Sequence, residues 1–209
     1  MHTEEVVEQG APLSKATKAL LLIHGRGAKA KDILPLARFF CDPHFYIAAP
    51  QATHQSWYPY SFMADEKLNA PWTDSAIESV EKLIRNTATY IPLEKIYIMG
   101  FSQGACLALE STAQFANRYG GVVAFTGGRI GKTIQKEKYH GDFAGTPIFI
   151  GTDDQDSHVP LERTQQSCKI LEDLGAKVTL KIYPGMGHTI SQEEIQWVQR
   201  HIFKYKTDA

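Results

Sequence analysis

The sequence Gly100-Phe101-Ser102-Gln103-Gly104 places a serine between two glycines where two hydrophobic patterns meet. Residues 96–99 form an unbroken apolar run, typical of a parallel strand covered on both faces, and the residues from 103 onward are small and apolar at helical spacing. A strand that turns directly into a helix strains its corner residue, and flanking glycines leave room for the crossing backbone. The pattern therefore predicts that Ser102 projects from the sheet edge as a nucleophile.

A serine hydroxyl is a poor nucleophile near neutral pH, so it needs a base within hydrogen-bond reach and a carboxylate that orients this base. Of the eight histidines, His188 is placed best. It ends the segment Gly185-Met186-Gly187-His188 after the last predicted strand, where the glycines allow a loop to carry the imidazole toward Ser102. His188 is the predicted base.

The orienting carboxylate is expected between these two residues, because the order serine, acid, histidine is typical of this sheet topology. Asp153, Asp154 and Asp156 all follow the predicted strand at 147–151. Asp156 is preferred, since it begins the short connection 156–160 into the next helix. Spacing leaves the other two aspartates open. The cluster lacks the glycine and glutamate of a calcium loop, so no metal is expected.

Acyl transfer also needs donors for the oxyanion, each of which accelerates such reactions by about 10²–10³. The backbone N–H of Gln103 is one candidate, at the positive end of the helix after the nucleophile. The other is the backbone N–H of Arg26, in the loop His24-Gly25-Arg26-Gly27 after the first long strand. His24 is expected to hydrogen-bond within its own loop.

Strands and helices alternate along almost the whole chain, which predicts an α/β fold with a mostly parallel sheet and helices on both faces. The 209 residues are expected to form one domain, 1–209, without a separate cap domain. Ligands bind such sheets at the carboxyl ends of the strands, where the loops that carry the candidate residues converge. The expected strands are 3–9, 18–24, 45–49, 96–99, 122–126, 147–151 and 177–183, and the expected helices are 31–40, 74–91, 103–115, 161–174 and 191–203.

Residues 51–72 form the longest stretch without clear periodicity, and they are rich in aromatic residues. Loops of that length in compact domains are usually functional. The side chains expected to offer apolar surface to an acyl or aromatic group are Trp57, Tyr58, Phe62, Trp72 and Met186. The alternative is that the aromatic residues pack in the core.

Composition excludes several classes of partner. A formal charge of −1 and a pI near 6.7 provide no field for nucleic acid or an anionic membrane. No charged leader with an apolar segment opens the chain, which predicts a cytoplasmic protein without stable membrane insertion. The three cysteines, Cys41, Cys106 and Cys168, lack metal-type spacing and are expected to be free thiols. The sequence indicates no oligomeric state.

Several segments of the sequence together resemble the phospholipase/carboxylesterase family of α/β-hydrolases, which includes acyl-protein thioesterases and lysophospholipases. They are His24-Gly25-Arg26-Gly27, Ala49-Pro50-Gln51 with Trp57-Tyr58, Gly100-Phe101-Ser102-Gln103-Gly104, Asp156-x-x-Val159-Pro160 and Gly187-His188. The similarity covers about residues 18–203. It implies a serine hydrolase that cleaves a small-molecule ester or another acyl substrate. It also implies a triad of Ser102, Asp156 and His188, oxyanion donors at Arg26 and Gln103, and no cofactor. The loop from Gly151 to Asp156 is longer than the usual family form, which keeps Asp153 and Asp154 open.

Three other functions fit parts of the sequence. A domain of this fold could serve as a non-catalytic binding protein. Residues 25–30 match a dinucleotide-binding fingerprint, but the second strand ends in Pro50-Gln51 without the acidic residue that a nicotinamide-dependent oxidoreductase needs. Gly131-Lys132-Thr133 resembles the end of a P-loop, but Thr126 stands where that motif requires glycine.

Overall fold

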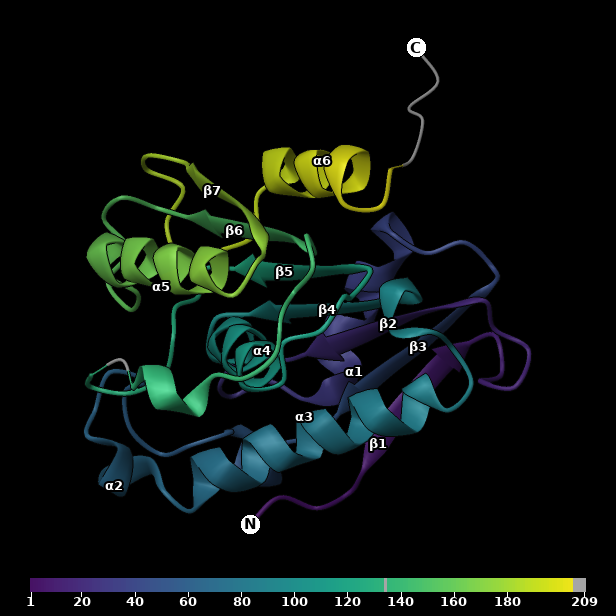
Figure 1. Cartoon of the computed structure of the whole chain (residues 1–209), viewed down its shortest axis with the longest axis horizontal. Helices are drawn as coiled ribbons and strands as arrows, with labels where there is room; N and C mark the ends of the chain where they lie inside the picture. The colour runs from purple at the N-terminus through teal and green to yellow at the C-terminus, as the bar shows by residue number, and fades with distance from the viewer. Residues whose placement is uncertain (134, 205–209) are drawn as a thin grey trace.

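Within the described part of the chain, seven strands form one sheet in the order β1-β3-β2-β4-β5-β6-β7 (Figure 1). The structure is a computed structural model that describes residues 1–133 and 135–204; residues 134 and 205–209 of the predicted domain lie outside the described ranges. β1 pairs antiparallel with β3, and the other neighbouring pairs are parallel. The strands are β1 (Val6–Gly10), β2 (Lys18–Ile23), β3 (Phe45–Pro50), β4 (Ile96–Phe101), β5 (Gly121–Phe125), β6 (Pro147–Thr152) and β7 (Lys177–Ile182).

Helices cover both faces of this sheet. They are α1 (Ala30–Ile33), α2 (Glu66–Asn69), α3 (Trp72–Ala88), α4 (Gln103–Gln114), α5 (Leu161–Asp173) and α6 (Gln192–His201). Successive strand side chains point to opposite faces, so Leu21 and Ile23 join the core under α3, α4 and α5, while Leu20 and Leu22 join the core under α1 and α6. The buried apolar strands thus contribute to two cores, one on each face of the sheet, which confirms the predicted α/β class.

Two segments differ from the predicted elements. The helix expected at 31–40 is a single α-helical turn, α1, followed by a 3-10 helix, Leu34–Phe39. Pro35 explains the change, because proline has no N–H to donate and its ring would clash with the carbonyl of Lys31 in a continuous α-helix. The loop 51–72 contains α2, which is only four residues long and so leaves no periodic pattern in the sequence.

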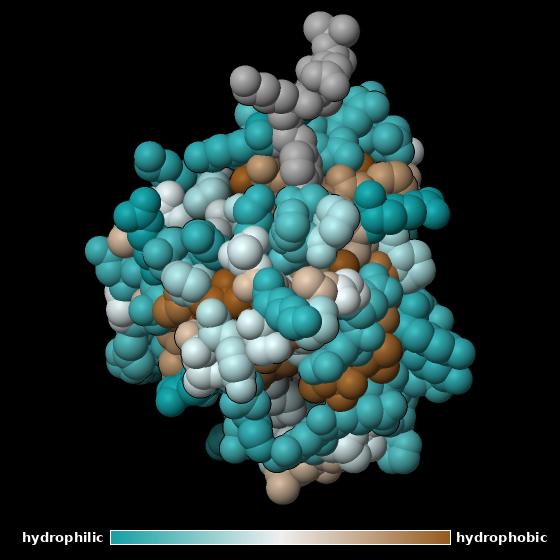
Figure 2. All heavy atoms as spheres, turned by 90° about the vertical axis from the view of Figure 1, so that its right-hand side faces the viewer, coloured by the Kyte–Doolittle hydropathy of each residue, from teal (hydrophilic) through white to brown (hydrophobic). Residues whose placement is uncertain are grey.

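The parallel strands all end at one edge of the sheet, the left side of Figure 1, where β4 turns into α4. Figure 2 shows the opposite end of the molecule, where hydrophilic residues predominate and hydrophobic ones lie in separate patches. Within residues 1–133 and 135–204, none of the helices has the length and apolar character needed to cross a membrane.

Two glycines allow β4 and α4 to meet at this edge. A Cβ atom on Gly100 would lie 2.2 Å from the carbonyl oxygen of Gly104, and one on Gly104 would lie 2.1 Å from the carbonyl oxygen of Ile23. Both obstacles are backbone atoms, which cannot move aside as a flexible side chain can. The first turn of α4 therefore sits directly on the end of β2, and only glycine permits this approach.

Replacing Gly104 with alanine should lower the free energy of unfolding by about 3 kcal/mol or more, because the added methyl group overlaps the backbone of β2. Urea denaturation measures the loss. The matched control is Gly185→Ala, where φ is +75° but nothing lies within 4 Å of the added atom. That change should cost about 1–2 kcal/mol, the cost of the left-handed conformation alone. Equal losses in the two variants would contradict the close approach.

Candidate active site

Ser102 occupies the corner between β4 and α4 with φ 55° and ψ −119°. This is an unusual conformation for a residue other than glycine, and surrounding hydrogen bonds maintain it. The Ser102 N–H donates to the carbonyl of Phe125 on β5 at 3.0 Å, and its carbonyl accepts from the N–H of Cys106 in α4 at 3.0 Å. The strained corner directs the Ser102 side chain out of the sheet edge, as expected of this turn.

Three side chains form a continuous hydrogen-bonded path at this corner. The Oγ of Ser102 lies 2.7 Å from Nε2 of His188, and Nδ1 of His188 lies 2.7 Å from Oδ2 of Asp156. The residues come from the β4–α4 corner, the loop after β7 and the loop after β6. The network assigns the proton of a neutral imidazole to Nδ1, which donates to the carboxylate, while Nε2 accepts from the hydroxyl.

Asp156 is held from both sides of its carboxylate. Oδ2 faces His188, while Oδ1 accepts from the N–H groups of His158 at 2.7 Å and Val159 at 2.8 Å. Its side chain has no exposed surface. Burial opposes ionisation, but the hydrogen bonds from His188, Val159 and His158 together outweigh it and lower the pKa of Asp156. Asp156 is therefore an anion that these hydrogen bonds hold in contact with Nδ1 of His188.

The two other candidate aspartates do not reach the imidazole. Asp153 is buried, and its carboxylate accepts from the N–H groups of Gln155, at 2.8 Å, and Gly187. These two hydrogen bonds lower the pKa of Asp153. Asp154 is exposed. Asp153 thus anchors the backbone next to His188, whereas Asp156 contacts its ring.

Asparagine at position 153 should lower the free energy of unfolding more near pH 7 than near pH 3. The pKa of Asp153 is lowered from 3.8 in the folded protein, so its ionisation stabilises the fold above that value and the benefit is lost as the pH falls through the folded pKa. Urea titrations at the two pH values measure the difference. A loss at position 153 that does not change with pH would contradict this role.

Gln103 follows Ser102 in the chain, and Arg26 belongs to the loop after β2. Gln103 is the first residue of α4, and its side chain accepts from the N–H of Trp57 at 2.9 Å and donates to the carbonyl of Tyr58 at 2.9 Å. A Cβ atom on Gly25, next to Arg26, would lie 3.5 Å from Cβ of Ser102. The loop after β2 therefore runs directly beside the serine.

His24 hydrogen-bonds within the surrounding loops. Its Nδ1–H donates to the carbonyl of Gly25 at 2.8 Å, and its Nε2 accepts from the N–H of Ala52 at 3.1 Å. The ring is fully buried, and burial lowers its pKa, which favours the neutral form. These contacts agree with the prediction that His24 has a structural position.

A cavity of about 630 Å³ opens beside Ser102 and His188. Its walls come mainly from the segments 58–62, 101–103 and 157–159. The residues that line it are Gly25, Arg26, Tyr58, Pro59, Tyr60, Ser61, Phe62, Phe101, Ser102, Gln103, Cys106, Ser157, His158, Val159 and His188.

Only part of the predicted apolar set reaches this cavity. Tyr58 and Phe62 line it. Trp57 is fully buried, and its Nε1–H donates to the carbonyl of His24 at 2.8 Å, so this indole packs in the core as the alternative prediction had it. Trp72 starts α3 and contacts the rings of His2 and His54 instead, and Met186 is not among the described residues that line the cavity. The expected position of these three side chains is therefore not observed.

Several cavity residues were not predicted from the sequence. Ser61, Ser157 and His158 lie in loops, where no periodic pattern indicates a direction for the side chain. The ring of His158 packs edge to face against that of His188, with 4.7 Å between centroids. The position of His158 two residues after Asp156 was the one available signal, because a loop that delivers the acid to the histidine also carries its neighbours there.

The family model for phospholipases and carboxylesterases matches residues 2–206 of the chain. The chain belongs to the phospholipase/carboxylesterase family. A probable carboxylesterase from Oryza sativa subsp. japonica is 30% identical over 205 residues, which cover 88% of this chain and 77% of the rice protein. Acyl-protein thioesterase 1 from Saccharomyces cerevisiae is 33% identical over 130 residues, which cover 58% of this chain and 55% of the yeast protein.

A solved member of the phospholipase/carboxylesterase family has the same fold over nearly its whole length. The crystal structure of a phospholipase/carboxylesterase from Dyadobacter fermentans DSM 18053 matches with a TM-score of 0.95 at 48% identity, covering 97% of this chain and 98% of that one. The match establishes the α/β-hydrolase fold. The relatives of the chain in this family thus include carboxylesterases and acyl-protein thioesterases.

Proposed function

We propose that this protein hydrolyses carboxylic esters or thioesters through an acyl-serine intermediate. Ser102 Oγ attacks the carbonyl carbon while His188 Nε2 removes the hydroxyl proton, and the Asp156 carboxylate stabilises the imidazolium that results. The observation that carries the proposal is the pair of 2.7 Å contacts that join Ser102 to His188 and His188 to Asp156 beside an open cavity.

The tetrahedral intermediate needs donors for its oxyanion. We assign this role to the backbone N–H groups of Gln103 and Arg26. The Gln103 N–H points out of the first turn of α4, where the helix dipole favours negative charge. Arg26 lies in the loop that passes beside Ser102. Because these donors are fixed in the fold before substrate arrives, they stabilise the transition state without reorganisation.

The same residues complete the cycle. The imidazolium of His188 returns the proton to the leaving alcohol or thiol, and the acyl group stays on Ser102. Water then attacks the acyl-serine, with His188 again accepting the proton, and the acid leaves as Ser102 regains its hydrogen. The reaction consumes one water and needs no redox partner, so the substrate requires only an ester or thioester carbonyl that fits the cavity.

The relatives support both substrate chemistries, since the rice protein is named as a probable carboxylesterase and the yeast protein as an acyl-protein thioesterase. A matched oxygen ester and thioester with the same acyl group distinguish the two. A series of acyl esters of increasing length then sizes the cavity, because each methylene that gains an apolar contact should raise kcat/KM and the first one that clashes should lower it.

The alternative is a binding protein that keeps the fold without chemistry. A serine-directed fluorophosphonate probe separates the two, because only an activated serine displaces fluoride. We expect one covalent adduct, on Ser102, and its loss in the His188→Ala variant, which keeps the serine but removes its base. Absence of labelling in the folded wild-type protein would favour the binding protein.

A further inference from the structure

The cavity beside Ser102 is unbalanced in charge. The chain as a whole has 22 basic and 23 acidic residues, yet the described residues that line the cavity include the guanidinium of Arg26 and no aspartate or glutamate. Of the other lining residues, Ser61, Ser157 and His158 can donate hydrogen bonds as well. The cavity therefore offers a cation and several donors to whatever enters it.

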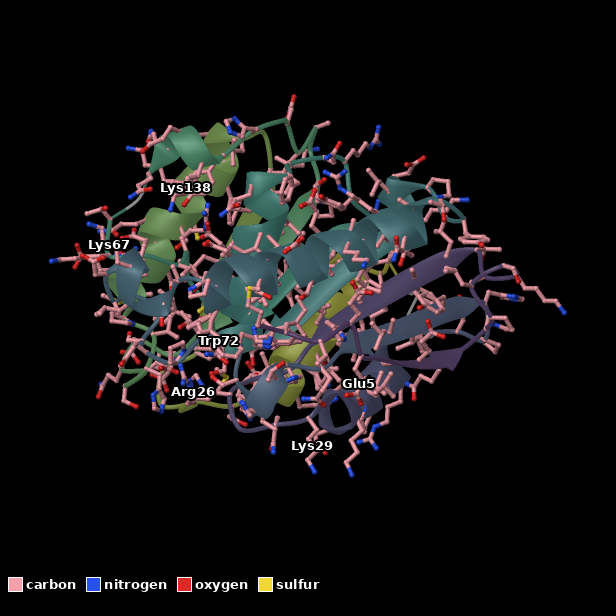
Figure 3. The ribbon with its side chains drawn as sticks, turned by 90° about the horizontal axis from the view of Figure 1, so that it is seen from below. Glu5, Arg26, Lys29, Lys67, Trp72 and Lys138 are labelled. Carbon is pink, nitrogen blue, oxygen red and sulfur yellow. The ribbon has the colours of Figure 1, made fainter. Side chains whose placement is uncertain are left out.

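Two backbone carbonyls hold the Arg26 guanidinium in place. Nη1 donates to the carbonyl of Pro59 at 2.8 Å, and Nη2 donates to the carbonyl of Tyr60 at 2.7 Å. The guanidinium also lies over the ring of Tyr58, 5.9 Å from its centroid. In Figure 3, Arg26 is at the left side of the molecule, the side on which the parallel strands end.

These contacts position the Arg26 charge without neutralising it. The carbonyl partners are uncharged, and within the described part of the chain Arg26 forms no ion pair with a carboxylate. A guanidinium has five N–H groups, so donors remain after the two carbonyls are satisfied. The Asp156 carboxylate cannot neutralise it either, because it is buried and hydrogen-bonded to His188 and to backbone N–H groups.

We propose that the substrate is an ester with a carboxylate a few bonds from the scissile carbonyl, and that the Arg26 guanidinium binds this carboxylate. The proposal rests on the proposed esterase function. One guanidinium, with no lysine and no second arginine among the described lining residues, matches a single negative charge. A carboxylate has that charge, whereas a phosphate monoester has a charge nearer −2. The planar fork of arginine also matches a carboxylate geometrically.

Two pairs of esters test the preference and show which half of the substrate has the charge. In the first pair, the para-nitrophenyl monoester of glutaric acid is compared with an ester whose acyl chain ends in isopropyl instead of carboxylate. In the second pair, the butanoate ester of glycolate is compared with isobutyl butanoate. Isopropyl has nearly the shape of carboxylate without its charge. Each kcat/KM value is corrected for hydrolysis without protein, and the change in the ratio of the two values between the wild-type protein and the Arg26→Gln variant isolates the contact of the anion with Arg26.

We expect this ratio to favour the anionic ester by about tenfold in at least one pair, a modest factor because the Arg26 side chain is exposed. Added salt should reduce it, since salt screens exposed charges. Arg26→Gln should bring the ratio to about one or below, and Arg26→Lys should keep part of the preference, because lysine retains the charge but lacks the planar fork that matches a carboxylate. The control Arg85→Gln, on α3, removes a charge away from the cavity and should leave the ratio unchanged.

Each result decides between the charge and a purely structural role for Arg26. A wild-type ratio of one or less in both pairs would overturn the proposal. So would an Arg26→Gln variant that slows both esters of a pair equally, because the side chain would then only support the loop 59–60. Failure of the esterase function itself is a separate result: the wild-type protein would hydrolyse neither the neutral nor the anionic esters.

Discussion

Replacing Ser102 with alanine is expected to lower kcat for an activated ester by about 10⁶, because the nucleophile, base and acid of such a triad act as one unit. In this variant the imidazole of His188 and the oxyanion donors remain, but no atom can form the acyl intermediate. Steady-state hydrolysis of a para-nitrophenyl ester, corrected for the rate without protein, measures the loss. Binding of substrate should change little, because the cavity walls are intact.

The control for this change is Ser79→Ala on α3, where the hydroxyl donates to the carbonyl of Ser75 within the helix. That variant should keep the wild-type rate. Circular dichroism and thermal unfolding of both variants show that the fold is preserved. A Ser102→Ala variant that is folded and retains most of its activity would reject the assignment of the nucleophile.

The change Asp156→Asn is expected to lower kcat by about 10⁴, as the equivalent change does in a serine protease with such a triad. The structure gives the reason. The N–H groups of His158 and Val159 both point at Oδ1, so the amide of asparagine must place its oxygen there and its NH₂ toward His188. An NH₂ group facing Nδ1 forces the imidazole proton onto Nε2, which can then no longer accept the proton of Ser102.

Asp153→Asn is the matched comparison, since it removes a buried carboxylate three residues earlier. Asp153 contacts the backbone N–H of Gly187 and not the imidazole, so activity should fall by less than tenfold while stability falls near pH 7. If the two asparagine variants lost activity in the reverse order, Asp153 would be the acid of the triad and the assignment of Asp156 would be wrong.

The fold could be predicted well because buried parallel strands leave a simple signal. β4 lies between layers of helices, so residues 96–99 are all apolar and stand out in the sequence. The prediction of one α-helix at 31–40 was wrong. The apolar residues there have helical spacing, but Pro35 interrupts the hydrogen bonds of an α-helix. Periodicity reports which side chains are buried, and a short 3-10 helix buries a similar set.

The meeting of Ser102, Asp156 and His188 could be anticipated because topology brings the ends of parallel strands to one edge. The choice of aspartate could not be fixed by spacing, since three carboxylates lie within four residues of a loop. What distinguishes them is the direction of each side chain, which depends on the hydrogen bonds of that loop. The catalytic roles of Ser102, Asp156 and His188 stay a proposal.

The cavity walls were the least predictable part of the site. Trp57 and Tyr58 are adjacent aromatic residues in the same loop and both are buried, but only Tyr58 is among the residues that line the cavity, and hydrophobicity does not distinguish them. The Arg26 side chain binds the carbonyls of Pro59 and Tyr60, which follow it in the chain by 33 and 34 residues. No sequence motif indicates such a contact, since every residue has a carbonyl. Only its backbone N–H could be assigned a role from the sequence.

The most direct test of the acyl-serine mechanism is to trap the intermediate. The wild-type protein is mixed with a para-nitrophenyl ester, quenched in acid during turnover, digested and analysed by mass spectrometry. The acyl-serine mechanism predicts that the mass of the acyl group appears on the peptide that contains Ser102 and disappears once the substrate is exhausted. Rapid hydrolysis with an acyl group bound stably to another residue, and none on Ser102, would contradict it.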